Sequence, residues 1–206
     1  MITVGLNPSC AEFPVDEPFR RFRGAQHVYP GILDGSFYSE YLAALNDYFR
    51  CNPYMRWFRS LEPLLDGMES GYHDGRANAA LHTDLCSPLA TVPTWSRLTY
   101  ERGILGLAGV RLWLRLVRHL APDVVLVSVA KEHLDRFDFP PLGEWETIYT
   151  VERTNPFLVK AREVEVVPGQ RTLIVFGRAS QTPFGTVRAL AKREIGRRVA
   201  ERAYGR

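Results

Sequence analysis

The stretch DVVLVSVA, residues 123–130, is apolar at nearly every position after its first aspartate. A strand that is apolar on both faces must be covered on both faces, as the strands of parallel sheets in α/β proteins are. A second stretch, RTLIVFG at 171–177, has the same character. We therefore predict that these two stretches are central strands of a mainly parallel sheet.

Segments with helical spacing alternate with these strands along the chain. Helices are predicted over 37–50, 54–68 (one helix or a broken pair), 100–120, 131–137 and after 186. Further strands are predicted over 2–4 and 77–84, with an edge hairpin at 145–153 and 162–167. This alternation predicts an α/β protein, with three α/β/α layers around a mainly parallel sheet, in a single domain over residues 1–206.

Composition narrows the class of protein. The 206 residues are 46% hydrophobic, which suits one globular domain with a sizeable core. Cys10, Cys51 and Cys86 lack the paired spacing of a disulfide framework or a zinc site, so we expect small buried side chains, no metal or cofactor and a reducing cytoplasm. No apolar run approaches the roughly 18 residues of a membrane span, and no signal peptide is recognised. We expect a cytoplasmic monomer without a membrane partner.

Positive charge gathers near the end of the sequence. From 186 to 206 there are seven Arg or Lys residues and two Glu, although the formal net charge of the whole chain is only +3. A basic helix here would suit a nucleic-acid backbone or would simply be a solvated face. Charge alone leaves both readings open.

Three loops follow predicted strands at the edge where parallel sheets bind ligands. They are GLNPS at 5–9, HTDLCSPL at 82–89 and SQTPFG at 180–185. The first opens a long segment, 7–36, which is rich in Pro, Gly and aromatic residues and is expected to be an ordered loop.

Taken together, these loops resemble those of the uracil-DNA glycosylase superfamily, closest to its mismatch-specific and single-strand-selective branches. The resemblance implies that Asn7 positions the hydrolytic water and that Asp84 recognises the extruded base. It places Ser180 where the family has a His or Asn, Thr182 at the phosphate-binding serine and Phe184 at the wedge leucine. Ser9 and Ser180 depart from the family pattern, and so does Asp84, which replaces the usual amide.

The residue type at position 84 bears on which base the site would recognise. An ionised carboxylate only accepts hydrogen bonds, so it matches the N4 amino group of cytosine and repels the O4 of uracil. Because excision of ordinary cytosine would destroy a genome, we expect a modified cytosine, such as a hypermodified base of phage DNA. A cap or an Arg partner for Asp84, and a uracil repair enzyme, remain alternatives.

Other residues are assigned around these three. Glu12 and Asp16 are candidate helpers of Asn7, and Phe13 and Phe22 are candidates to stack on the base. His82 is expected on the same strand face as Asp84, either tuning it or satisfied in the core, and Trp95 either lines the pocket or packs. The predicted DNA-contacting residues are Pro8, Ser9, Arg178, Thr182, Pro183, Phe184, Arg188 and Lys192.

The sequence thus favours a monofunctional DNA glycosylase that leaves an abasic site, since no lysine is placed as a Schiff-base nucleophile. One alternative is a nucleic-acid-binding protein on the same scaffold without catalysis, which the Ser180 departure keeps open. Another is an N-glycosidase acting on a free nucleoside or nucleotide. An exposed Phe184 and a basic terminal helix would count against that alternative.

Overall fold

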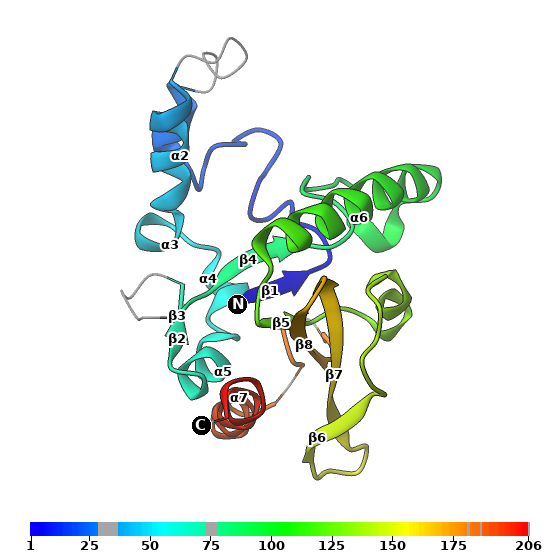
Figure 1. The fold of residues 1–206 in the computed structure, drawn as a ribbon. Coiled ribbons are helices and arrows are strands. Elements are labelled where there is room, and N and C mark those ends of the chain that lie inside the picture. The colour runs from blue at the N-terminus through cyan, green and yellow to red at the C-terminus, as the bar shows by residue number, and fades with distance from the viewer. Residues whose placement is uncertain (29–36, 73–77, 181, 186, 206) are drawn as a thin grey trace.

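The computed structural model describes residues 1–206 apart from 29–36, 73–77, 181, 186 and 206 (Figure 1). Its strands are β1 (Ile2–Gly5), β2 (Ser70–Gly71), β3 (Asn78–Ala79), β4 (Leu81–Asp84), β5 (Val124–Val127), β6 (Glu146–Val151), β7 (Phe157–Val167) and β8 (Gln170–Gly177). Its α-helices are α1 (Arg23–Gln26), α2 (Tyr38–Asn46), α3 (Tyr48–Cys51), α4 (Met55–Phe58), α5 (Glu62–Gly67), α6 (Tyr100–Leu120) and α7 (Ala189–Tyr204). Two 3-10 helices, η2 (Trp95–Arg97) and η3 (Lys131–Arg136), lie on either side of β5 in the sequence.

Six strands form one mixed sheet in the order β4-β1-β5-β8-β7-β6. The first four strands in this order pair in parallel with one another, whereas β7 pairs antiparallel with both β8 and β6. The predicted α/β class with a mostly parallel sheet is confirmed. The predicted hairpin also forms, with β6 at the edge and β7 inside the sheet between β6 and β8.

The sheet is covered on both faces. All four residues of β5 are buried, and they alternate between two cores. Val125 packs in one core with Trp113 of α6, and Leu126 packs in the other with Leu64 of α5 and Ile195 of α7. Figure 1 accordingly shows α6 on one side of the sheet and α5 with α7 on the other. Burial on both faces is the reason that this stretch lacks the polar alternation of a half-exposed strand.

Local differences from the predicted elements are small. The segment 54–68 is a broken pair, α4 and α5, and 131–137 forms a 3-10 helix. The long segment after Asn7 contains α1 and several turns, and its part at 29–36 lies outside the described residues. The expected burial of the cysteines holds for Cys86 and is wrong for Cys51, which is exposed. Within the described ranges, no helix is long and apolar enough to cross a membrane.

The segment after β8 packs into the fold instead of projecting from it. The Phe184 side chain is 0% exposed and belongs to the core shared with α5 and α7. Its backbone N–H donates to Ser128 Oγ at 2.8 Å, and a Cβ on Gly177 would collide with its ring, so this position needs glycine. The expectation that Phe184 is an exposed wedge is wrong, because an aromatic ring in the core stabilises the fold and cannot enter a base stack.

Lys192 and Pro183 also differ from their predicted DNA-binding role. Lys192 is 4% exposed, and its Nζ donates to the Ser60 carbonyl (2.8 Å), to Ser60 Oγ (2.6 Å) and to the Pro183 carbonyl (2.8 Å). Burial lowers the pKa of Lys192 to about 8. Pro183 itself is buried. Both assignments to the DNA surface are therefore wrong, since these residues join the loop after β8 to the segment between α4 and α5.

Much of the positive charge on α7 is paired on the protein. The ion pairs of this helix are Arg193–Asp66, Arg197–Glu194, Arg197–Glu201, Arg198–Glu194 and Arg202–Glu146. Such surface pairs contribute little to stability individually, but they offset the basic excess seen in the sequence. Arg188 is exposed immediately before the helix.

The burial of Phe184 generates a direct prediction. Phe184→Ala should lower the free energy of unfolding by about 3–5 kcal/mol, because it leaves a cavity in the core. Leu190→Ala is the control: its side chain is 78% exposed, and the change should stay within about 0.5 kcal/mol. Urea unfolding followed by circular dichroism measures both, and equal stability of the two variants would contradict the packing.

Candidate active site

The carboxyl ends of β1 and β4 meet at one edge of the sheet. The two strands pair in parallel with Gly5 opposite Asp84, and the pairing continues through hydrogen bonds from Leu85 N to the Gly5 carbonyl (3.0 Å) and from Cys86 N to the Leu6 carbonyl (2.8 Å). The loop that begins at Leu6 therefore starts beside Asp84. This is the place where sheets of this type bind ligands.

A cavity of about 210 Å³ opens at this edge. Its aromatic wall consists of Phe13, Phe22, Tyr48, Phe49 and Phe58, and its polar groups are Glu12, His82 and Asp84. The rings of Phe13 and Phe22 stack with an interplanar angle of 5° and centroids 5.6 Å apart, and Phe22 stacks in turn on Tyr48 at 4.8 Å. We call this cavity the Asp84 pocket. It is a small pocket with aromatic walls and a few convergent polar groups, a lining that is typical of ligand sites.

The Asp84 carboxyl is shielded from water. Its side chain is 14% exposed, and burial raises its pKa to about 8, with a further upward contribution from the negative charge of Glu12. Asp84 is therefore largely protonated at pH 7. The expectation that Asp84 is an ionised, accept-only carboxylate is wrong, because a neutral carboxyl offers one O–H donor and one carbonyl acceptor.

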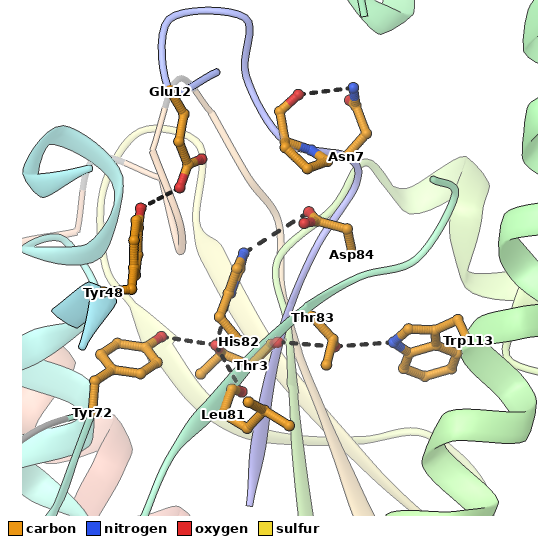
Figure 2. A network of polar contacts seen from close by, with 11 residues as sticks. Thr3, Asn7, Glu12, Tyr48, Tyr72, Leu81, His82, Thr83, Asp84 and Trp113 are labelled. Atoms are coloured by element: carbon orange, nitrogen blue, oxygen red, sulfur yellow. Dashed lines mark hydrogen bonds and ion pairs between the residues drawn. The ribbon is translucent and has the colours of Figure 1, made fainter. Parts of the chain in front are cut away.

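His82 lies against Asp84 on the same strand, as predicted. Its Nδ1 is 2.9 Å from Thr3 Oγ1, which in turn is 2.7 Å from the Tyr72 hydroxyl (Figure 2). Burial lowers the pKa of His82 to about 4, so the ring is neutral at pH 7. Its Nε2 lies 3.8 Å from Asp84 Oδ1. With both groups neutral, this contact is not an ion pair and does nothing to favour an ionised Asp84.

Gly5 makes room for this pair of side chains. A Cβ at this position would lie 2.8 Å from Asp84 Oδ1 and 3.4 Å from the His82 ring. Glycine leaves space for both side chains at the end of β1, where a Cβ would require the Asp84 carboxyl to shift. The Gly5 that opens the GLNPS motif thus has a packing reason within the site.

Glu12 reaches the pocket from the turn after the motif. The amides of Glu12 and Phe13 both donate to the Ser9 carbonyl, at 2.9 and 3.0 Å, and Ser9 Oγ accepts from Ala11 N at 3.1 Å. The Tyr48 hydroxyl donates to Glu12 Oε1 (Figure 2). Burial raises the pKa of Glu12, while the Tyr48 hydrogen bond and the charge of Arg21 oppose this. Ser9 in this sequence therefore shapes the turn that delivers Glu12.

Asn7 lies beside the pocket rather than among its lining residues. Its Nδ2 donates to the Pro8 carbonyl (3.0 Å) and to Thr91 Oγ1 (3.3 Å), which fixes the orientation of the amide. Among the described residues, no protein donor reaches Oδ1, the carbonyl oxygen of the Asn7 side chain. This oxygen can therefore accept a hydrogen bond from water. Pro8, next to Asn7, does line the pocket.

The third predicted loop is placed elsewhere. Strand β8 is separated from β1 by β5, and neither Ser180 nor Thr182 belongs to the pocket lining that the structure describes. Ser180 is exposed, and Thr182 Oγ1 donates to the Gly185 carbonyl at 3.2 Å. Asp16 is exposed and Trp95 is buried in the core next to α6, so neither lines the pocket.

Arg178 lines a different and larger depression of about 880 Å³. Three other cations border it, Lys131, Arg153 and Lys160, together with the acidic Glu132 and Asp135. Aromatic side chains of Trp145, Phe157 and Phe176 complete its walls. Phe157 and Phe176 are each only 7% exposed and belong to the cores beneath this depression.

The sequence did not identify the aromatic residues that α3 and α4 contribute. Tyr48 and Phe58 fall within the predicted helices at 37–50 and 54–68 and were assigned no role in a site. Phe58 packs edge-on against the His82 ring at 4.9 Å, and Tyr48 binds Glu12. A density of aromatic residues over 48–58 was the available signal, but spacing alone does not show which ring faces a cavity.

No protein-family model matches the chain, and no curated protein or solved structure is significantly similar to it. The resemblance to the glycosylase superfamily thus rests on the loop motifs and on the order of the elements.

The raised pKa of Asp84 predicts a pH-dependent gain in stability for Asp84→Asn. The folded state retains this proton up to about pH 8, whereas the unfolded chain loses it in the ordinary carboxyl range. Asp84 therefore makes the wild type less stable as pH rises through this window, by up to about 1.4 kcal/mol per pH unit. Urea unfolding at pH 5.0 and 7.5 should show that the advantage of Asp84→Asn grows with pH. A pH-independent difference would contradict the protonated state.

Proposed function

We propose that this protein is a monofunctional DNA glycosylase that hydrolyses the N-glycosidic bond of an extruded pyrimidine, in particular a modified cytosine. The observation that carries the proposal is the buried Asp84 carboxyl, which lines the Asp84 pocket together with aromatic rings and Glu12, close to Asn7. A single base of DNA can enter the Asp84 pocket only after it leaves the helical stack. Phe13 and Phe22 stack on each other with centroids 5.6 Å apart, so they form one aromatic wall on which a flat base can stack.

Asp84 supplies the hydrogen-bonding edge. As a neutral acid, it can donate to ring N3 of cytosine and accept from the N4 amino group. With the roles of its two oxygens exchanged, it also pairs with N3–H and O4 of uracil. Pairing alone therefore admits both pyrimidines, and a uracil repair enzyme is the alternative within the same class. A hypermodified cytosine of phage DNA would make this a defence enzyme.

Asn7 and Glu12 supply the water side of the reaction. Cleavage passes through an oxocarbenium-like sugar, which needs a water molecule held against the anomeric carbon and stabilisation of the departing base. The Asn7 carbonyl oxygen can orient this water, and the Glu12 carboxylate can accept its proton. No lysine lines the Asp84 pocket among the described residues, in keeping with hydrolysis rather than Schiff-base chemistry.

Contacts with the DNA backbone are assigned to cations on the surface. Arg178, Lys131 and Arg153 are exposed at the larger depression, where Lys160 is half-buried, and Arg188 is exposed ahead of α7. Cations of this kind neutralise phosphates and make affinity depend on salt. The buried Phe184 takes no part in this interaction, so extrusion of the nucleotide relies on capture of the base in the Asp84 pocket.

Base release measured by mass spectrometry tests the proposal. The substrates are oligonucleotides and phage DNAs that contain uracil, cytosine, 5-hydroxymethylcytosine or glucosylated cytosine. The wild type should release a cytosine-type base, and Asn7→Ala should slow this release about 100-fold because the water is misplaced. Asp84→Ala should abolish it.

Arg171→Ala is the matched control, because this exposed residue lies at the opposite end of β8 from the carboxyl edge and should leave release unchanged. Preferential release of uracil would move the assignment to a uracil repair enzyme. Tight DNA binding without release of any base would instead indicate a nucleic-acid-binding protein on this scaffold.

A second function is favoured by a specific observation. Phe184 and Lys192 are buried, and most arginines of α7 are paired, so two arguments against a free nucleoside or nucleotide as substrate are lost. An N-glycosidase acting on the monomer would use the same Asp84 pocket without a DNA surface.

Salt dependence separates the two substrates. For a DNA glycosylase, release from an oligonucleotide under subsaturating conditions should fall at least tenfold between 50 and 200 mM salt, because phosphate contacts release counterions. Arg178→Ala should flatten this dependence, and Arg171→Ala should leave it unchanged. Faster release from the free nucleotide than from the oligonucleotide, with little effect of salt, would favour the N-glycosidase.

A further inference from the structure

We propose that Asp84 is the general acid of the reaction: its carboxyl O–H donates to ring N3 of a 4-aminopyrimidine and passes its proton to N3 as the glycosidic bond breaks. This inference rests on the proposed function and deepens it, since it gives a chemical reason for a cytosine-type base. A neutral carboxyl can transfer a proton to the base, which an amide at the same position cannot do.

The geometry around Asp84 favours the acid form from every side. On its own strand it faces the neutral His82, 3.8 Å away, and Gly5 of β1 presents only backbone. From the loop after β1 it faces Glu12, whose negative charge disfavours a second carboxylate. Within the described residues, no Lys or Arg lies within ion-pairing distance of Asp84.

The next layer of charged groups is committed to other partners. Arg136 Nη1 is 3.8 Å from Cys86 Sγ, and the charge of Arg21 acts on Glu12 and Tyr48. Cys86 is buried, and its pKa is raised mainly by burial. Burial and the charge of Glu12 raise the pKa of Asp84 to about 8, and no cation among the described residues compensates a carboxylate there.

The cytosine edge is the one that can use this proton. In cytosine, N3 carries a lone pair and N4 carries hydrogens, so the Asp84 O–H points at N3 while its carbonyl oxygen accepts from N4–H. Uracil already carries a hydrogen on N3, so this atom has no lone pair that could accept the Asp84 proton. Asn in place of Asp84 would make the same two hydrogen bonds to cytosine but holds no transferable proton.

Proton transfer accompanies cleavage of the glycosidic bond. The C1′–N1 bond breaks and its electron pair stays with the base, while the proton of Asp84 moves to N3, so that the base leaves neutral and Asp84 becomes a carboxylate. The water oxygen bonds to C1′, and the proton that this water loses goes to Glu12. Solvent then returns a proton to Asp84 and takes one from Glu12. An acid whose pKa lies near the working pH is well suited to such a transfer.

Single-turnover release from a cytosine-type oligonucleotide tests this role. Asp84→Asn should bind the oligonucleotide within about threefold of wild type, yet release the base about 10²–10⁴-fold more slowly. The wild-type rate should fall tenfold per pH unit above about pH 8, as Asp84 loses its proton. Glu12→Gln removes both the proposed proton acceptor and a neighbouring negative charge, so it should lower the rate at every pH and shift this fall to lower pH.

A substrate with 3-deazacytosine is the sharpest probe, because it keeps the N4 amino group and replaces N3 by C–H. The wild type should bind it and release it at least 100-fold more slowly than cytosine. Equal release of both bases, a flat wild-type profile up to pH 10, or an Asp84→Asn rate within threefold of wild type would overturn the acid role.

The result also separates the two proposals. Any of these outcomes, with base release by the wild type intact, leaves the glycosylase standing and removes only the role of Asp84. If the wild type releases no base from any substrate at any pH, the proposed function fails and the acid role fails with it. Arg171→Ala again serves as the control for preparation and folding.

Discussion

The packing of the Asp84 carboxyl over Gly5 is the constraint on which the site depends. Parallel pairing of β1 and β4 places these two residues opposite each other at the end of both strands. Because Gly5 has no Cβ, the carboxyl and the His82 ring can lie against the backbone of β1 and away from water. Desolvation there costs free energy that an ionised carboxylate would not recover, so the group keeps its proton.

The rest of the site follows from this edge of the sheet. The chain leaves β1 through Asn7 and turns at Ser9, which brings Glu12 and Phe13 to the rim of the pocket. Rings from α3 and α4 close the opposite side, so the polar groups face a space walled by aromatic carbon. Two carboxyl groups with different partners in one pocket permit a division of labour between acid and base.

The opposite half of the carboxyl edge serves stability. The loop after β8 is fastened by Lys192, Ser60 and Ser128, and it inserts Phe184 into the core between the sheet and α7. A loop held in this way has little freedom to enter a base stack. The exposed cations around Arg178 remain the best-placed surface for a polyanion in the proposed function.

The sequence predicted the parts of this structure that local pattern controls. The doubly apolar β5 and the amphipathic α6 were recognisable from their sequence patterns. The place of the candidate site, at the ends of the strands that stop at Gly5 and Asp84, followed from the rule that ligands bind at one edge of a parallel sheet. The burial of Phe184 was not predictable, because a Pro-Phe-Gly loop looks exposed until Gly177 and Ser128 are seen beneath it. The protonation of Asp84 likewise depends on Glu12 and on rings distant in sequence.

The most direct test of the account is a ¹³C NMR titration of the Asp84 side-chain carboxyl, with and without free cytosine as the product base, assigned with Asp84→Asn. We expect a carboxyl that is protonated at pH 7, titrates near pH 8 and changes its chemical shift when cytosine is added. A carboxyl that is already ionised at pH 6 and unaffected by cytosine would contradict the account.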